Sequence, residues 1–275
     1  MTGQRTERAD APPRETDLAV FADVAVFEPA QTQRVLTAMA GLQAQRNRLA
    51  HAVQQGSLPH TRIAATGALE INRWLFEEGP RWKDMLSVRP WGRVEELRVT
   101  LPRNRQFVAD GNRMVSVFDY QGTTPQARLL LSAEKSGRYL FAYAPLQIKI
   151  ADNRQVVLDG PVVSGEPTIM LTSEPTILAA AHAYWRAVLD SSFPCSEAPE
   201  RIADLTDRQR QVMAFLSTDV SDEQIAAVIG VSVRTVRADI ARVMTLLGVR
   251  SRFSLGQAVR DRLKAAQPAV VNGGR

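Results

Sequence analysis

Residues 221–248, SDEQIAAVIGVSVRTVRADIARVMTLLG, hold the clearest structural pattern in the chain. Ser221 with a glutamine three positions later is a capping-box pair, which marks the start of a helix. Gly230 stands where a left-handed residue would end that helix, and Ser232 suits the N-cap of a second one. Two short helices joined by a tight, glycine-containing turn form a helix-turn-helix, whose second helix fits the major groove of DNA. The stretch therefore predicts a helix-turn-helix with its second helix over 232–247.

The flanking residues extend this helical pattern, and the net charge changes sign along this part of the chain. Thr206 and the glutamine three positions later repeat the capping box before an apolar run, and a last helix is expected from Arg252 to Leu263. The residues from Arg201 to Gly230 have a net charge of −2, whereas eight basic and two acidic residues from Val231 to Lys264 give +6. Such a switch favours a face that meets a polyanion, although a solvated basic face is an equal alternative on charge alone.

The second helix of the pattern has one apolar and one polar face. If Val236, Ile240 and Val243 face the core, the remaining side chains are left for phosphate and base contacts. These candidate DNA-binding residues are Arg234, Arg237, Ala238, Ala241 and Arg242. Ser232 and Thr235 lie at the helix start, where hydroxyl and backbone N–H groups can hold a phosphate.

From Leu205 to Lys264 the chain resembles the DNA-binding domain of LuxR/NarL-type bacterial transcription regulators. The motifs that carry the resemblance are Leu205-Thr206, Ser221–Ala226, Gly230–Ser232, Arg234–Arg237 and Leu247–Arg252. The resemblance implies that Arg237, Ala238 and Ala241 read bases. It also implies phosphate contacts by Ser232, Thr235 and Arg252. Ser221 and Arg250 are further residues that are expected to bind DNA.

Two residues depart from the family pattern. Gln209 stands where the family usually has Glu, and Asp239 stands where a basic residue or His is common. A carboxylate directed at DNA would repel phosphates. Asp239 is expected to pair with Arg242 three positions on, or alternatively to accept a hydrogen bond from cytosine N4.

The earlier part of the chain is predicted to form a mixed α/β domain over 18–190. Helices are expected at 31–55, Ile63–Glu78 and Pro175–Leu189, and strands at Glu96–Leu101, Arg113–Tyr120, Ala127–Leu131 and Arg138–Ala142. Alternating residues on both sides of Asp152-Asn153, from Leu146 to Leu158, are typical of a hairpin. The expected fold class is a mixed sheet with helices, followed by an all-α four-helix helix-turn-helix domain.

The helix expected at 31–55 has apolar residues at alternating steps of three and four. It could pair two subunits as a short coiled coil, or it could pack as an amphipathic helix on its own domain. Outside the two domains, 1–17 and 266–275 are expected to be disordered tails. Residues 191–200 have the composition of a linker, and 201–265 are assigned to the helix-turn-helix domain.

The stretch Tyr143–Pro161 resembles the hairpin of phospholipase D-like domains, in which His-x-Lys-x4-Asp supplies phosphohydrolase chemistry. Placing Asp152 at the Asp position puts Pro145 at the His position and Gln147 at the Lys position. The following helix is similar in style to the end of that domain in TrmB-like sugar-responsive regulators. Because the nucleophilic His and the cation are both absent, the resemblance implies this fold without its catalysis.

Composition excludes several other classes. The chain is 45% hydrophobic and 23% charged, which is ordinary for a globular protein. It lacks an apolar run long enough for a membrane helix, and its charged N-terminus does not fit a signal peptide. One Cys and three His residues cannot build a disulfide or a Cys/His zinc site. We therefore expect a soluble, cytoplasmic protein without a metal, a cofactor or catalytic residues.

The sequence favours a DNA-binding transcription regulator that reads double-stranded DNA, forms a homodimer and is regulated through its N-terminal domain by a small-molecule or protein effector. One alternative is a protein-interaction adaptor with secondary DNA contact. A phosphodiesterase is a weaker alternative, since Pro145 and Gln147 replace the catalytic pair.

Overall fold

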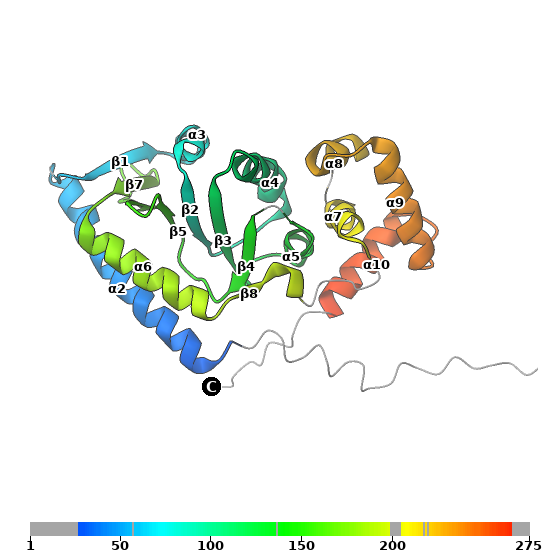
Figure 1. The fold of residues 1–275 in the computed structure, drawn as a ribbon, viewed down its shortest axis with the longest axis horizontal. Coiled ribbons are helices and arrows are strands. Elements are labelled where there is room, and N and C mark those ends of the chain that lie inside the picture. Colours follow the sequence, from blue (N-terminus) through cyan, green and yellow to red (C-terminus); the bar gives the residue numbers. More distant parts are fainter. Residues whose placement is uncertain are drawn as a thin grey trace, which may run out of the picture.

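The computed structural model describes residues 27–56, 58–135, 137–198, 205–216, 218 and 220–265. It contains an α/β part that ends near Ala198 and a helical part that starts near Leu205 (Figure 1). The tails expected at 1–17 and 266–275 lie outside the described residues, as do residues 199–204.

One eight-stranded mixed sheet forms the centre of the α/β domain. Its order is β1-β7-β6-β5-β2-β3-β4-β8. The strands are β1 (Thr61–Thr66), β2 (Asp84–Arg89), β3 (Arg113–Asp119), β4 (Arg138–Ala142), β5 (Ile148–Ala151), β6 (Gln155–Asp159), β7 (Thr168–Thr172) and β8 (Phe193–Pro194). β2, β3 and β4 are parallel neighbours, and the remaining pairs are antiparallel. Parallel strands need crossover connections, which α4 (Val94–Ala109) and α5 (Pro125–Ser132) supply.

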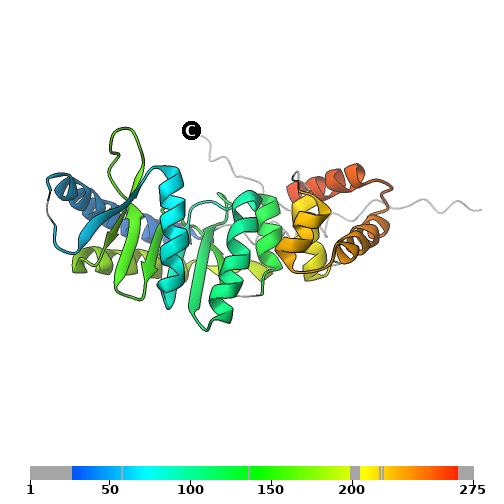
Figure 2. The ribbon, with the colours of Figure 1, turned by 90° about the horizontal axis from the view of Figure 1, so that it is seen from above.

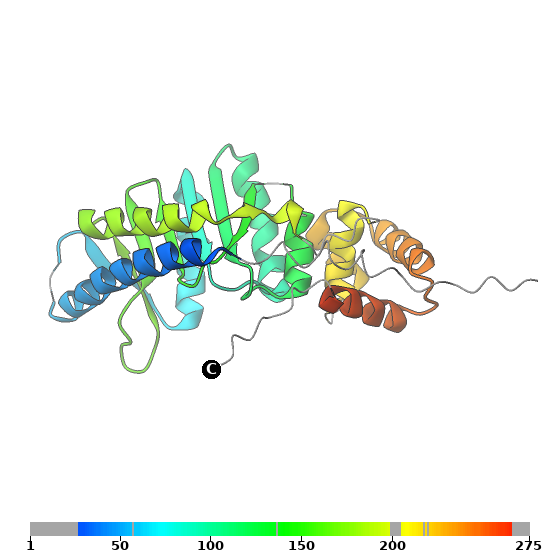
Figure 3. The same ribbon diagram turned by 90° about the horizontal axis from the view of Figure 1, so that it is seen from below.

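Helices cover both faces of this sheet. α2 (Pro29–Gln54) and α6 (Pro175–Asp190) lie side by side on one face (Figure 3). α3 (Ala68–Glu78), α4 and α5 cover the other face, where Figure 2 shows them in sequence along the sheet. Along β3, Val117 packs in the α2–α6 core and Phe118 in the core on the opposite side. Successive side chains of β3 thus point to opposite faces of the sheet, and both faces are buried.

The long helix packs within its own domain. Val35, Leu42 and Leu49 of α2 are buried, and they belong to the same apolar cluster as Ile177 and Tyr184 of α6. The interpretation of this segment as an amphipathic helix of its own domain is confirmed. Pairing of two subunits through α2 stays a prediction.

Two expected strands are wrong, because both segments are helices. Leu97, Val99 and Leu101 alternate like a strand, but Leu97 and Leu101 are buried on one helical stripe of α4 while Val99 is 46% exposed. Ala127–Leu131 lies in α5, where Thr124 caps the helix by accepting from the backbone N–H of Ala127. A short apolar run does not by itself distinguish a buried strand from a buried helix.

Other elements agree with expectation more closely. β3, β4 and α6 occupy the expected places, and Asp152 and Asn153 form the hairpin turn with φ of 52° and 59°. The single helix expected at Ile63–Glu78 is wrong in its first turn. There β1 runs to Thr66, and Gly67 with φ of 84° separates it from α3. The sequence pattern does not predict β2 or β7.

The segment expected to be a linker is packed where the structure describes it. β8 pairs with β4, and Cys195 is only 1% exposed beside the apolar cluster of the helical domain. A linker composition therefore does not mean a free connection here. Among the helices of the described residues, none combines the length and apolarity needed to cross a bilayer. The same residues hold no cluster of three His, Cys, Asp or Glu side chains suited to a metal.

Candidate nucleic-acid interface

Four helices form the second domain, and they match the pattern expected from the sequence. They are α7 (Asp207–Leu216), α8 (Asp222–Ile229), α9 (Val233–Leu246) and α10 (Arg252–Ala265). Ser221 and Gln224 make a complete capping box at the start of α8. Gly230 ends α8 with φ of 72° in the left-handed region, and its N–H donates to the carbonyl of Ala226. Val231 and Ser232 then lead into α9, so α8 and α9 form a helix-turn-helix.

The apolar side of α9 fixes which side chains remain outside. Val236, Ile240 and Val243 are buried in one cluster with Phe215 of α7 and Leu255 of α10. The opposite side of α9 leaves Arg234, Arg237, Ala238, Ala241 and Arg242 exposed. In Figures 1 and 2, α9 lies on the side of the helical domain that faces away from the sheet. The α/β domain therefore leaves this surface open.

Hydroxyl groups mark the start of α9. The hydroxyl of Ser232 accepts from the backbone N–H of Thr235 at 3.1 Å and lies 2.8 Å from the Thr235 hydroxyl. Both side chains are thus turned to the first turn of α9, where unpaired backbone N–H groups favour an anion. Ser221 has the same N-cap role at α8, and Arg250 is exposed in the turn before α10.

The arginine that is expected to read bases is held by carboxylates at the start of α8. Arg237 Nε donates to Asp222 at 3.1 Å, and its Nη2 lies 3.4 Å from Glu223. Arg252 also donates to Asp222. Partial burial alone would raise the pKa of Asp222, but hydrogen bonds from Arg252 and Arg237 hold that pKa below its ordinary value. The Asp222 carboxylate therefore links Arg237, which is expected to read bases, to Arg252, which is expected to contact a phosphate.

Sequence reasoning did not identify Asp222 and Glu223 as partners of Arg237. The available signal was their position in the first turn of α8, where acidic residues suit the helix dipole. Only the crossing of α8 and α9 brings that turn beside Arg237.

Asp239 lies within ion-pair distance of Arg242, as expected, but Arg242 is not its closest partner. Asp239 is 1% exposed and accepts from Arg208 of α7 at 2.6 and 3.2 Å, whereas Arg242 lies 4.0 Å away. The hydrogen bond and charge of Asp239 raise the pKa of Arg208. A buried, paired carboxylate does not point at DNA, which also removes the alternative of a contact with cytosine. Arg208 and Asp239 lie far apart in sequence, so no local pattern signals the pair.

The helical domain packs directly on the α/β domain. α5 is buried between the sheet and α7, and one apolar cluster contains Leu130 of α5 together with Met213 and Phe215 of α7. Arg105 of α4 donates to Glu134 at 2.6 Å and to the carbonyl of Val228 in the last turn of α8 at 2.7 Å. Lys135 and Asp207 add an ion pair of 2.5 Å. The α/β domain thus contacts both α7 and α8.

The phospholipase-like positions do not gather into one constellation. Gln147 precedes β5 and Asp152 follows it, so the two side chains lie at opposite ends of this strand. Asp152 accepts the backbone N–H groups of Lys83 and Asp84 at 2.7 and 2.9 Å, which ties the hairpin turn to the start of β2. Its role in the structure is therefore to fix backbone.

Residues 203–258 match the family of bacterial regulatory proteins named the luxR family. This part of the chain is a LuxR-family helix-turn-helix DNA-binding domain, as the sequence motifs predicted. A search of curated proteins gives no match for the chain.

Several solved structures are similar at low identity. NucT from Helicobacter pylori is 11% identical, with a TM-score of 0.38 over 49% of this chain and 98% of its own. The phospholipase D family member Nuc from Salmonella typhimurium is 11% identical, with a TM-score of 0.39 over 50% and 98%. The archaeal chromatin protein TrmBL2 is 11% identical, with a TM-score of 0.37 over 58% and 64%.

Proposed function

We propose that this protein is a sequence-specific regulator of bacterial transcription that reads the major groove with α9. The exposed face of α9 in a LuxR-family domain is the observation that carries the proposal, because it joins three arginines to two alanines small enough for close approach to bases. Arg237 lies near the middle of this face and discriminates bases once it leaves Asp222. Such a role locates the protein in the cytoplasm, with the bacterial genome.

Phosphate contacts come from the rim of the same face. Arg234, Arg242, Arg250 and Arg252 neutralise backbone charge, and the hydroxyls of Ser221, Ser232 and Thr235 add hydrogen bonds. Asp239 stays with Arg208 and keeps α9 fixed on α7. Binding therefore depends steeply on salt, whereas base preference depends on Arg237 with Ala238 and Ala241.

The protein acts as a homodimer in this proposal, with two copies of α9 on an inverted repeat whose half-sites lie about one helical turn apart. Regulation passes through the contacts of α5 with α7 and of Arg105 with α8. An effector that shifts α4 or α5 changes how the two copies of α9 are presented to DNA.

No catalytic role is proposed for the α/β domain. Pro145 cannot act as a nucleophile, Gln147 carries no charge, and Asp152 is engaged with backbone N–H groups. A chromogenic phosphodiester assay on the full chain checks this point, and turnover that survives Gln147→Ala and Asp152→Ala would place hydrolysis at some other site.

The test of the function is fluorescence anisotropy of the full-length protein on DNA from upstream of its own gene and on a scrambled duplex. We expect roughly a 10³-fold or greater preference at physiological salt. Arg237→Ala should lose most of that preference, whereas Arg252→Ala should weaken both duplexes equally. Arg186→Ala, which removes an exposed arginine of α6 in the α/β domain, is the matched control.

Two results would count against the proposal. If Arg237→Ala weakens the affinity for both duplexes equally, Arg237 does not read bases. If sites selected from the whole genome also show no preferred sequence, the adaptor alternative replaces the regulator.

A further inference from the structure

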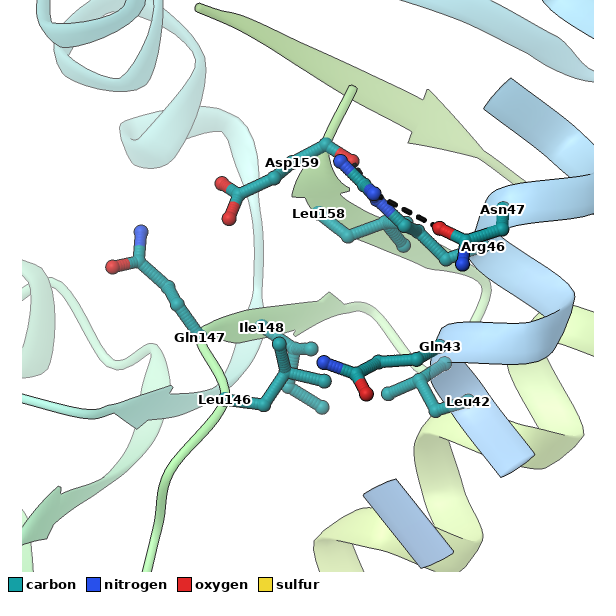
Figure 4. Close-up of a pocket in the computed structure, with 9 residues that line it drawn as sticks. All are labelled: Leu42, Gln43, Arg46, Asn47, Leu146, Gln147, Ile148, Leu158 and Asp159. Atoms are coloured by element: carbon teal, nitrogen blue, oxygen red, sulfur yellow. Dashed lines mark hydrogen bonds between the residues drawn. The ribbon is translucent and has the colours of Figure 1, made fainter. Parts of the chain in front are cut away.

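A cleft of about 330 Å³ lies between α2 and the open end of the β5–β6 hairpin (Figure 4). Its apolar wall combines Leu42 of α2 with Leu146, Ile148 and Leu158 from the hairpin side. Leu42, Ile148 and Leu158 are buried members of the α2–α6 core, so this wall is a fixed part of the fold. The volume lies at the lower end of the range of small-molecule sites, and four branched apolar side chains suit a short hydrocarbon body.

Arg46 of α2 holds the two sides of the cleft together. Its Nε donates to the carbonyl of Asp159 at 2.8 Å, and its Nη2 donates to the carbonyl of Gly160 at 2.7 Å. Its Nη1 donates to the side chain of Asn47 at 3.0 Å, which fixes the guanidinium on α2 as well. These bonds join α2 to the end of β6, so the distance between the two sides is set before a ligand arrives. Small-molecule sites are usually preformed in this way.

Three polar side chains that line the cleft are not engaged elsewhere. They are the amides of Gln43 and Gln147 and the carboxylate of Asp159. None of them makes a hydrogen bond or a salt bridge with another residue in the described ranges. Figure 4 shows Gln43 extending from α2 and the other two side chains on the hairpin side. A few polar groups around an apolar wall are what fixes the orientation of a small ligand.

The Asp159 carboxylate determines which head group fits. Burial raises the pKa of this carboxyl, and the positive charge of Arg46 offsets the rise only in part, because the guanidinium is directed at backbone carbonyls. A partly desolvated carboxylate is best satisfied by a donor that is itself charged, since such hydrogen bonds are about twice as strong as neutral ones. An ammonium group provides this donor, and its remaining N–H bonds suit the amide oxygens of Gln43 and Gln147.

We propose that the cleft between α2 and the β5–β6 hairpin binds a small primary amine. The ammonium group pairs with the Asp159 carboxylate and donates to Gln43 and Gln147, while a short hydrocarbon body lies against the apolar wall. A simple alkylamine and an amino acid with an apolar side chain both offer this chemistry, and the amino acid adds a carboxylate that Arg46 attracts. The site uses no residue of the helical domain, so this inference goes beyond the DNA-binding function and does not depend on it.

Ligand-observed NMR titration of the full chain at neutral pH tests the proposal with molecules of matched shape. Isopentylamine and L-leucine carry both the ammonium group and the hydrocarbon body, methylamine lacks the body, and isocaproate has a carboxylate in place of the ammonium group. We expect isopentylamine or L-leucine to bind at least about tenfold more tightly than methylamine and isocaproate. The tighter of the two identifies the ligand as an alkylamine or an amino acid. The proposal is overturned if neither binds, or if isocaproate binds as tightly as they do.

Variants assign the binding to this cleft. Asp159→Asn keeps the backbone carbonyl that Arg46 binds and removes only the charge, so the preferred amine should bind at least about tenfold more weakly. Asp190→Asn, at an exposed carboxylate in the last position of α6, is the matched control and should leave the affinity unchanged. Gln43→Trp narrows the cleft from an exposed position of α2 and should reduce the preference for the larger amine over methylamine.

The Asp159 carboxylate has no hydrogen-bond partner among the described residues, so the urea midpoint of Asp159→Asn should not fall. A loss of affinity in this variant is therefore not a loss of the fold. Equal affinity of the wild type and Asp159→Asn for the preferred amine overturns the assignment to this cleft.

Discussion

Replacing Lys149 by methionine should stabilise the protein at neutral pH. The folded chain disfavours the charged amine, since its pKa falls from an ordinary 10.5 to about 7 through burial and the nearby charge of Arg89. Methionine keeps the apolar stem that packs along β5 and removes the group that is difficult to charge. The native state therefore loses an unfavourable feature that the unfolded chain does not have.

The magnitude follows from the two pKa values. Lowering a pKa by one unit corresponds to about 1.4 kcal/mol, so the fall of the Lys149 pKa from 10.5 to about 7 amounts to about 4–5 kcal/mol. Solvent near the partly exposed side chain reduces this effect, and we expect a gain on the order of 2–4 kcal/mol at pH 7.

The sign of the pH dependence is fixed by the same values. Between pH 7 and 10.5 the unfolded chain binds more protons at Lys149 than the folded chain does, so wild-type stability rises with pH across this window. The advantage of Lys149→Met should be complete below pH 7 and should fade towards pH 10. Comparing the variant with the wild type cancels the titration of groups common to both.

Urea unfolding between pH 6 and pH 10 measures this difference. Lys83→Met is the control, since it removes an exposed ammonium nearby and should change the unfolding free energy little. An equal gain at every pH, or no gain at pH 7, would refute the reasoning about burial of Lys149.

Three further changes test other parts of the structure. Asp222→Asn releases Arg237 and Arg252 from a carboxylate. The affinity for a scrambled duplex should therefore rise by roughly three- to tenfold in anisotropy titrations. An unchanged affinity would mean that Asp222 does not compete with the phosphates of DNA for these arginines. Arg208→Met leaves the buried carboxylate of Asp239 without its closest partner, and the free energy of unfolding in urea should fall by about 3 kcal/mol. Arg242→Met is the control and should leave the urea midpoint nearly unchanged. A larger loss of stability in Arg242→Met than in Arg208→Met would contradict this pairing. Arg105→Met removes the hydrogen bond to the carbonyl of Val228, so amide hydrogen exchange in the last turn of α8 should become faster. If the exchange rates equal those of the wild type, the apolar contacts of α5 with α7 alone hold the helical domain in place.

The helix-turn-helix could be predicted closely because its signals are local. Ser221, Gly230 and Ser232 each determine the conformation of backbone within three or four residues, and the structure places a cap or a helix end at each of them. The basic face of α9 followed from helical periodicity alone, since burial of Val236 and Ile240 determines what remains outside.

The α/β domain was predicted less well because its elements are apolar on both sides or only a few residues long. Leu97, Val99 and Leu101 alternate as a strand would, and only the packing of α4 over β3 decides that Val99 faces solvent. Apolar composition signals burial, but without a clean period it does not select the element.

By itself, the sequence determined the helical domain, the helix with the exposed basic face and the candidate residues for DNA contact, because caps and periodicity act over one or two turns. Only the tertiary structure decided that Asp239 pairs with Arg208, that Asp222 holds Arg237, and that Lys149 lies near Arg89 and donates to the hydroxyl of Ser87. Each of these contacts joins residues that lie far apart in the sequence, so no local sequence pattern signals it. Coulomb and desolvation energies depend on distance in space, and that distance is set by the packing of helices and strands.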